Sequence, residues 1–192
     1  MMARRIGVLA LQGDFEKHKR ALEAAGAEAR EVRTAEDLDG LSGLIIPGGE
    51  STTLTLLLLP ELLERLHTFC ETHPVWGTCA GMIMLSKDAS DPRVKPLGFL
   101  DLDIQRNGYG RQVHSFESDL KLSGNVEDAQ TPLHGVFIRA PRITRMGENV
   151  EPLAWLGSDP VAVRQGHFMA SSFHPELTGD LRLHRFFLSL RP

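Results

Sequence analysis

Three short stretches in the first half of the chain are almost entirely apolar, at residues 6–11, 44–46 and 75–78. Continuous apolar runs of this length are typical of strands that are buried on both faces of a parallel sheet. Residues 28–32 are a plausible further strand between the first two runs. The pattern therefore predicts four strands within the first 78 residues.

The segments around these strands have helical features. Asp14 can cap a helix after the first strand, and Gly26 stands where that helix should end. Residues 52–73 are helical in pattern, with a break or a new start at Pro60, and another helix-compatible run begins at Met82. The resulting order, β-α-β-β-α-β-α, predicts an α/β fold with a doubly wound, mostly parallel sheet flanked by helices.

The second half of the chain has shorter strand-like runs separated by turns and polar loops. Residues 161–165 and 168–173 indicate a hairpin around Gly166 and His167, and residues 181–190 indicate a closing helix. Further strands are predicted at residues 98–114, 115–122 and 135–138, with polar loops at 88–92 and 123–132. Because neither a repeat nor a linker interrupts these 192 residues, we expect a single domain over residues 1–192.

The composition, with 42% hydrophobic and 24% charged residues, is that of a soluble globular protein. A formal net charge of −4 argues against a general nucleic-acid binder. The longest apolar run, at residues 54–63, contains Pro60 and Glu61, so no membrane span is expected. Because the run at residues 6–11 is too short for the core of a signal peptide, we expect a cytoplasmic protein.

A cysteine between two glycines follows the fourth predicted strand, in Gly77-Thr78-Cys79-Ala80-Gly81. The Gly-x-Cys-x-Gly pattern is the cysteine version of a nucleophile elbow, a tight turn between a strand and a helix. The start of that helix would favour the thiolate form of the sulfur. The alternative is an inert buried cysteine, which is how we interpret Cys70.

A thiolate needs a base, and the segment Ser172-Phe173-His174-Pro175-Glu176 offers one at the end of a predicted strand. In an extended chain, His174 and Glu176 point to the same side, so the carboxylate can orient the imidazole toward the thiol. A surface ion pair beside a turn is the alternative. The pattern is weak alone and becomes strong when it is combined with the elbow.

Residues 47–53 read Pro-Gly-Gly-Glu-Ser-Thr-Thr, a glycine pair before the start of a helix. Exposed backbone N–H groups in such a loop can hold an anion. A nucleotide-binding loop is excluded because the segment has no lysine. The N–H groups of Gly49 and Ala80 would make an oxyanion hole, although a plain structural turn remains an alternative.

Arg106 and Arg139 stand among glycines or prolines beside apolar strands. Either arginine can hold a substrate carboxylate, and the alternative for both is a solvated surface charge. His114, His134 and His167 lack the spacing of metal ligands, so no metal site is expected.

The elbow cysteine, the late His-x-Glu and the upstream Gly-Gly loop together resemble the class I, or triad, glutamine amidotransferases, which have a flavodoxin-like fold. The sequence is most similar to the glutaminase subunits of pyridoxal 5′-phosphate synthase. The motifs that carry this resemblance run from residue 7 to residue 178, and they are GVLALQG at 7–13, PGGESTT at 47–53, GTCAG at 77–81, Arg106-Asn107, GRQV at 110–113, GVFIRAP at 135–141 and SFHPELT at 172–178.

The resemblance implies hydrolysis of L-glutamine to L-glutamate and ammonia, and transfer of the ammonia to a synthase subunit that makes pyridoxal phosphate. It implies no cofactor of the chain's own. It gives Cys79 as nucleophile, His174 as base and Glu176 as the acidic member. It also implies the glutamine-binding residues Gly48, Gly49, Glu50, Ser51, Arg106, Ile138 and Arg139.

Other interpretations stay open at this point. A glutaminase subunit of another pathway and a non-catalytic regulatory subunit have the same fold. A cysteine peptidase would cleave peptides rather than free glutamine. An α/β-hydrolase orders its triad as nucleophile, acid and histidine, whereas here Glu176 follows His174. We also hypothesise that the Gly48–Gly49 peptide flips to complete the oxyanion hole when a partner binds.

Overall fold

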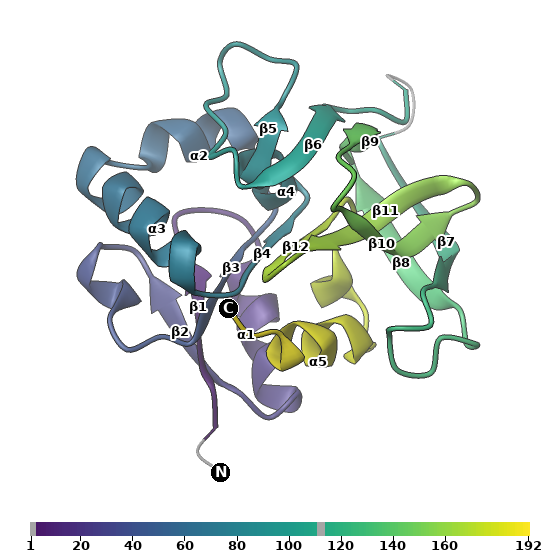
Figure 1. Cartoon of the computed structure of the whole chain (residues 1–192), viewed down its shortest axis with the longest axis horizontal. Helices are drawn as coiled ribbons and strands as arrows, with labels where there is room; N and C mark the ends of the chain where they lie inside the picture. The colour runs from purple at the N-terminus through teal and green to yellow at the C-terminus, as the bar shows by residue number, and fades with distance from the viewer. Residues whose placement is uncertain (1–2, 111–113) are drawn as a thin grey trace.

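The computed structural model describes residues 3–110 and 114–192, and within them one large sheet organises the chain (Figure 1). Its nine strands follow the order β2-β1-β3-β4-β12-β11-β10-β7-β8. The first five strands in this order pair in parallel. These are β2 (Glu28–Val32), β1 (Arg5–Leu9), β3 (Gly43–Ile46), β4 (Val75–Thr78) and β12 (Phe168–Ser171).

From β12 onward the sheet is antiparallel. These strands are β11 (Asp159–Gln165), β10 (Glu151–Leu156), β7 (Ser115–Leu122) and β8 (Leu133–Ile138). The predicted hairpin between β11 and β12 is confirmed, as Gln165 pairs with Phe168. The doubly wound α/β half is also as predicted. The sheet as a whole is mixed rather than mostly parallel. Tight hairpins join β10 to β11 and β11 to β12, a longer hairpin joins β7 to β8, and hairpin connections produce antiparallel pairs.

The helices cover both faces of the parallel half (Figure 1). They are α1 (Phe15–Ala24), α2 (Ser51–Leu57), α3 (Pro60–Thr72), α4 (Ala80–Leu85) and α5 (Arg182–Ser189), with 3-10 helices η1 (Glu36–Leu38) and η2 (Pro175–Leu177). The break at Pro60 is confirmed, because Pro60 begins α3. Asp14 stands at the start of α1 without capping it through its side chain, and it forms an ion pair with Lys17 at 2.9 Å instead.

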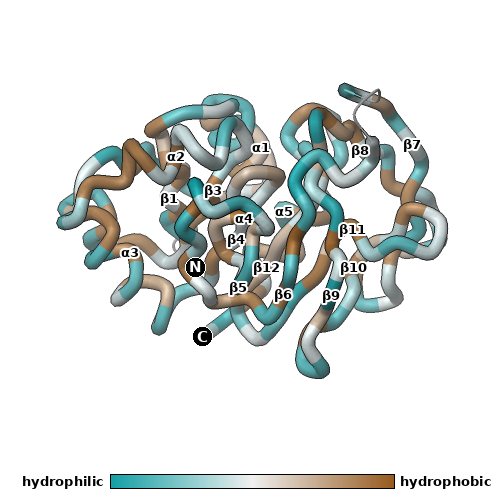
Figure 2. The backbone as a smooth tube through the Cα atoms, turned by 90° about the horizontal axis from the view of Figure 1, so that it is seen from above, coloured by the Kyte–Doolittle hydropathy of each residue, from teal (hydrophilic) through white to brown (hydrophobic). Residues whose placement is uncertain are grey.

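Two cores lie on opposite faces of the sheet because successive strand residues point to opposite sides. In β3, Leu44 and Ile46 pack with α3 and α4, whereas Ile45 packs with α1 and α5 on the other face. Figure 2 shows the apolar stretches of these strands inside the molecule. Leu56 and Leu59, at the junction of α2 and α3, are exceptions that are 82% and 68% exposed.

A second sheet contains β5 (Ser86–Asp88), β6 (Leu100–Gln105) and β9 (Arg142–Met146). Some sequence-based bounds were wrong here. The strand predicted at 98–114 is limited to β6, a turn follows it at 106–109, and residues 111–113 lie outside the described part of the chain. The strands β5, β9 and β10 were not predicted. Within the described ranges, no helix has both the length and the apolar character needed to cross a membrane.

The carboxyl ends of the parallel strands meet at one edge of the sheet, and the predicted site residues follow those ends. Pro47 comes directly after β3, Cys79 after β4 and Ser172 after β12. Open α/β sheets bind ligands at this edge, so the fold brings the separate motifs to one place.

Candidate active site

Cys79 occupies a strained turn between β4 and α4. Its backbone angles are φ 50° and ψ −105°, a region that residues other than glycine rarely adopt. Strain of this kind costs about 1–3 kcal/mol and is maintained only by well-fixed surroundings. The Cys79 N–H donates to the Ser171 carbonyl at 2.8 Å, which ties the elbow to β12.

The glycines on either side of Cys79 are required by close backbone contacts. A Cβ atom on Gly77 would collide with the backbone of Gly81, and one on Gly81 would collide with the Ile46 carbonyl. The strand-turn-helix geometry expected of a nucleophile elbow is therefore present.

His174 and Glu176 form a buried hydrogen bond, with 2.7 Å between His174 Nδ1 and Glu176 Oε1. The residues are 9% and 6% exposed, so the alternative of a surface ion pair is wrong. The backbone between His174 and Glu176 is not extended, as the sequence had predicted, but helical. Pro175 begins the 3-10 helix η2, and this turn brings the carboxylate back onto the ring.

The imidazole of His174 faces Cys79 on its other side, and the charges of the three groups are coupled. Burial alone would lower the pKa of His174, but hydrogen bonds to Cys79 and Glu176 and the negative charges of both outweigh burial and raise it to about 10. Burial would raise the pKa of Glu176, and the nearby His18 and His174 lower it overall. Glu176 is therefore a carboxylate that holds a protonated His174 beside the sulfur.

The Gly-Gly loop packs directly against this pair. A Cβ atom on Gly48 would lie 2.5 Å from His174 Cε1 and 3.2 Å from Cys79 Cβ, so only glycine fits there. Gly49 has φ +133°, and the side chain of Gln12 holds the next residue through hydrogen bonds of 2.9 and 3.1 Å to the Glu50 backbone. The proximity of this loop and Cys79 fits an oxyanion hole made by Gly49 and Ala80, which stays a prediction.

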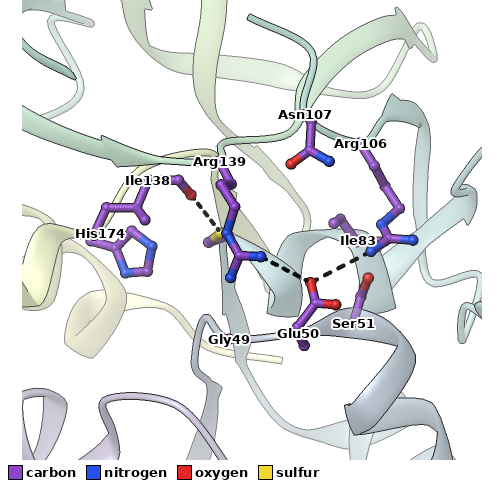
Figure 3. Close-up of a pocket in the computed structure, with 10 residues that line it drawn as sticks. Gly49, Glu50, Ser51, Ile83, Arg106, Asn107, Ile138, Arg139 and His174 are labelled. Atoms are coloured by element: carbon purple, nitrogen blue, oxygen red, sulfur yellow. Dashed lines mark hydrogen bonds and ion pairs between the residues drawn. The ribbon is translucent and has the colours of Figure 1, made fainter. Parts of the chain in front are cut away.

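A cavity of about 90 Å³ opens beside Cys79, and most of the residues predicted for the site line it. The lining residues are Gly49, Glu50, Ser51, Cys79, Ile83, Arg106, Asn107, Ile138, Arg139 and His174 (Figure 3). Gly48 and Glu176 lie behind this wall, against His174. The cavity thus joins segments from both halves of the chain.

Charged groups face one another across the mouth of the cavity. The Glu50 carboxylate lies 3.6 Å from the Arg106 guanidinium and 3.8 Å from that of Arg139 (Figure 3). Arg106 is also paired with Asp91, and its side chain is 16% exposed, so it is not a solvated surface charge. The Arg139 side chain is 54% exposed and lies at the rim.

Several residues at the site were not identified as site residues from the sequence. Ile83 and Asn107 line the cavity, Asp91 holds Arg106, and His18 contacts Glu176. Asn107 has φ 48°, and its place beside Arg106 in a glycine-containing turn was the available signal. Asp91 and His18 carry no such signal, because their contacts come from segments distant in sequence.

Two curated relatives match nearly the whole chain. Pyridoxal 5′-phosphate synthase subunit PdxT of Thermus thermophilus is 54% identical over 189 residues, which cover 96% of each chain. The protein of the same name from Parafrankia sp. is 54% identical over 194 residues, covering 99% of this chain and 94% of that protein.

A solved structure also matches the fold over nearly the whole chain. A structure described as a glutamine amidotransferase superposes with a TM-score of 0.88 at 52% identity, covering 95% of this chain and 96% of that one. The predicted amidotransferase fold class is confirmed by this match. The SNO glutamine amidotransferase family matches residues 8–190. Since that match spans almost the entire sequence, the chain belongs to the SNO glutamine amidotransferase family.

Proposed function

We propose that this chain hydrolyses L-glutamine to L-glutamate and ammonia. The observation that carries the proposal is the arrangement of Cys79, His174 and Glu176. A strained elbow holds the sulfur against His174, and hydrogen bonds to Cys79 and to the buried Glu176 carboxylate keep that histidine protonated. Membership of an amidotransferase family gives this arrangement its substrate.

In the first half of the reaction, the Cys79 sulfur attacks the side-chain carbonyl carbon of glutamine. The N–H groups of Gly49 and Ala80 stabilise the developing oxyanion. His174 is protonated at neutral pH because its pKa is raised to about 10, and it gives its proton to the departing ammonia. The C–N bond breaks and a glutamyl thioester remains on Cys79.

In the second half, the now neutral His174 removes a proton from water, and the resulting hydroxide attacks the thioester. The C–S bond breaks, glutamate leaves and the sulfur returns to its starting state beside protonated His174. Glu176 keeps one ring nitrogen occupied at 2.7 Å throughout, so the other nitrogen always faces the reacting atoms.

The cavity offers complementary groups to both ends of glutamine. Arg106 and Arg139 are placed to hold the α-carboxylate, and Glu50 is placed to hold the α-ammonium group. The Ser51 hydroxyl is buried at the cavity and has no hydrogen-bond partner among the described residues, which leaves it for a substrate atom. The Ile138 carbonyl lies 3.8 Å from the Cys79 sulfur, and Gly48 packs against Cys79 and His174. Both residues therefore lie next to the place of the glutamine side-chain amide.

We further propose that the ammonia passes to a synthase subunit that makes pyridoxal 5′-phosphate, in a cytoplasmic complex of two kinds of subunit. The two relatives described above are each named as a subunit of that synthase, which supports this partner over one from another pathway. The chain would serve as a single glutaminase domain over residues 1–192 and would need no cofactor of its own.

The test is glutamate release from glutamine, measured with and without a purified pyridoxal 5′-phosphate synthase subunit. We expect turnover with the partner and none after Cys79→Ala. The matched control is Cys70→Ala, because Cys70 is a buried cysteine in α3, away from the site. Turnover near the wild-type rate in the Cys79→Ala variant would exclude Cys79 as nucleophile.

The same purified protein separates the other interpretations when it is tested with peptides and with other partners. Cleavage of peptides but not of free glutamine would favour a cysteine peptidase. An absence of ammonia release with the synthase subunit present, from a protein that binds that subunit, would favour a regulatory role. Activation by the partner of a different pathway would change the proposed pathway and leave the chemistry intact.

A further inference from the structure

Behind the triad, His18 of α1 lies fully buried against Glu176. Its Nε2 atom is 3.2 Å from Glu176 Oε2 and 3.2 Å from the Thr78 hydroxyl. Thr78 is the residue before Cys79, and Glu176 is the hydrogen-bond partner of His174. His18 Nε2 therefore contacts both the residue before the nucleophile and the carboxylate that orients His174, although His18 does not line the cavity.

The two oxygens of Glu176 have different surroundings. Oε1 is bound to His174, whereas Oε2 is buried and has no well-aligned donor among the described residues. Nε2 of His18 lies 3.2 Å from Oε2, and the hydrogen bond of that nitrogen is with the Thr78 hydroxyl, at the same distance. A buried carboxylate oxygen requires a donor, because an unmatched one loses the stabilisation that water would give it.

The carboxylate selects one form of the His18 ring. If Nε2 carried a lone pair, that lone pair would face a negatively charged oxygen at 3.2 Å, which is repulsive. If Nε2 carries the proton, the N–H donates to the Thr78 hydroxyl and its positive end also lies beside Glu176 Oε2, so both contacts are favourable. Nδ1 then carries the lone pair, and no donor among the described side chains is bound to it.

We propose that His18, in its neutral Nε2–H form, is a positioning residue that fixes Glu176 and thereby aims His174 at Cys79. This inference rests on the proposed glutaminase reaction. The N–H of His18 attracts the negative Oε2 at 3.2 Å, so Oε1 stays directed at His174 Nδ1. It also ties the end of β4, which carries the nucleophile, to the turn that carries the acid.

The groups around His18 are consistent with a neutral ring. Burial lowers the pKa of His18, and His174 lowers it further, while Glu176 and Asp14 oppose that change. His184 of α5 packs 5.7 Å from the His18 ring, between centroids, and its own pKa is lowered by burial to about 3. Glu176 therefore remains the carboxylate and His18 the neutral donor.

His184 provides a matched control within the same cluster. Like His18 it is 0% exposed, and it packs edge-on against Trp76 at 4.9 Å between ring centroids. Neither of its ring nitrogens has a hydrogen-bond partner among the described residues. A variant at His184 thus loses a buried histidine of the same cluster without losing a donor to Glu176.

The kinetic test compares His18→Leu, His18→Gln and His184→Leu in glutamate release by the full chain with its synthase subunit. The Gln amide nitrogen can occupy the place of Nε2, so this variant retains the donor. We expect kcat to fall about 10- to 100-fold in His18→Leu, the range found for partners that orient a functional histidine, with KM for glutamine little changed. His18→Gln and His184→Leu should remain close to wild type.

A second readout does not depend on glutamine. Alkylation of Cys79 by iodoacetamide reports the sulfur beside His174, and Cys70 does not interfere because burial raises its pKa to about 12. Without the Nε2–H group of His18 beside Oε2, the ionised form of Glu176 is less stabilised, and the protonated form of His174 is less favoured. The pH profile of alkylation should therefore move to higher pH in His18→Leu but not in His184→Leu.

The wild-type protein gives the decisive result even if a variant fails to fold. Nitrogen-15 NMR of histidine-labelled protein distinguishes the two neutral forms and the protonated form of His18. The Nδ1–H form or the protonated form would overturn the proposal, as would equal kcat and equal alkylation profiles for His18→Leu and His184→Leu. A wild type without glutaminase activity would reject the proposed function, while NMR and alkylation would still decide the role of His18.

Discussion

Gly48→Ala is the smallest change that tests how the site is packed. The added Cβ atom would lie 2.5 Å from His174 Cε1, whereas carbon atoms in contact are separated by about 3.5–4.0 Å. The ring must therefore move by about 1 Å, or the loop must move instead. The loop is held from behind, because Gly13 packs on the Gly48 carbonyl and Gln12 is bonded to the Glu50 backbone.

A displacement of about 1 Å at a reacting group costs about 100-fold in rate, which corresponds to about 2.7 kcal/mol in the barrier. Movement of the ring also weakens the 2.7 Å hydrogen bond to Glu176, and hydrogen bonds to charged groups contribute about 1.5–3 kcal/mol. We therefore expect Gly48→Ala to reduce kcat about 100-fold and to lower Tm by a few degrees.

The assay is steady-state glutamate release with the synthase subunit, together with thermal unfolding followed by circular dichroism. The control is Gly124→Ala, where an added Cβ atom meets nothing within 4 Å and the backbone is not in the left-handed region. Gly48→Ala with the same kcat as Gly124→Ala would refute the packing of the loop against His174.

Three further outcomes follow from other parts of the structure. Arg139→Gln removes a charge at the cavity rim and should raise KM for glutamine about 10- to 100-fold, with a smaller change in kcat, in steady-state kinetics. An unchanged KM would exclude Arg139 from substrate binding. His184 binds a proton in the unfolded chain below pH 6.5 but in the folded chain only below about 3, so the free energy of unfolding falls as pH falls between these values. His184→Phe should reduce this loss by up to about 1.4 kcal/mol per pH unit, measured by urea titrations at several pH values. The same pH dependence in wild type and variant would contradict the lowered pKa of His184. Arg182 is nearly buried, and its guanidinium donates hydrogen bonds to Asp180 and to three backbone carbonyl oxygens. Arg182→Ala should therefore lower the free energy of unfolding, measured in urea, by about 3–5 kcal/mol. A loss below about 1 kcal/mol would match a surface ion pair instead.

The parallel half of the fold was predictable because its signals are local. The strands β1, β3 and β4 are continuous apolar runs, and Pro60 marks the start of α3 through its fixed backbone angle. The strands β9 and β10 were missed for a physical reason. Arg142–Met146 is short and largely polar, and Glu151–Leu156 contains a proline and pairs with β11 through shifts in register.

The residues of the candidate site also fall into those with a local sequence signal and those without one. Cys79, His174 and the Gly-Gly loop lie in motifs whose chemistry is visible in a few adjacent residues. From the sequence alone, Arg106 was compatible with a solvated surface charge, because its burial depends on Asp91 from another loop. His18 looked like any residue of an amphipathic helix, and only the packing of α1 against η2 shows its contact with Glu176.

The central claim is that Cys79 forms a covalent bond to the glutamyl group. The most direct measurement is acid quenching of the active complex during turnover of isotope-labelled glutamine, followed by peptide mass spectrometry. The mechanism predicts a labelled glutamyl thioester on the peptide that contains Cys79, and none on the peptide that contains Cys70. Label on a different residue, or rapid glutamate release that continues in Cys79→Ala, would contradict it.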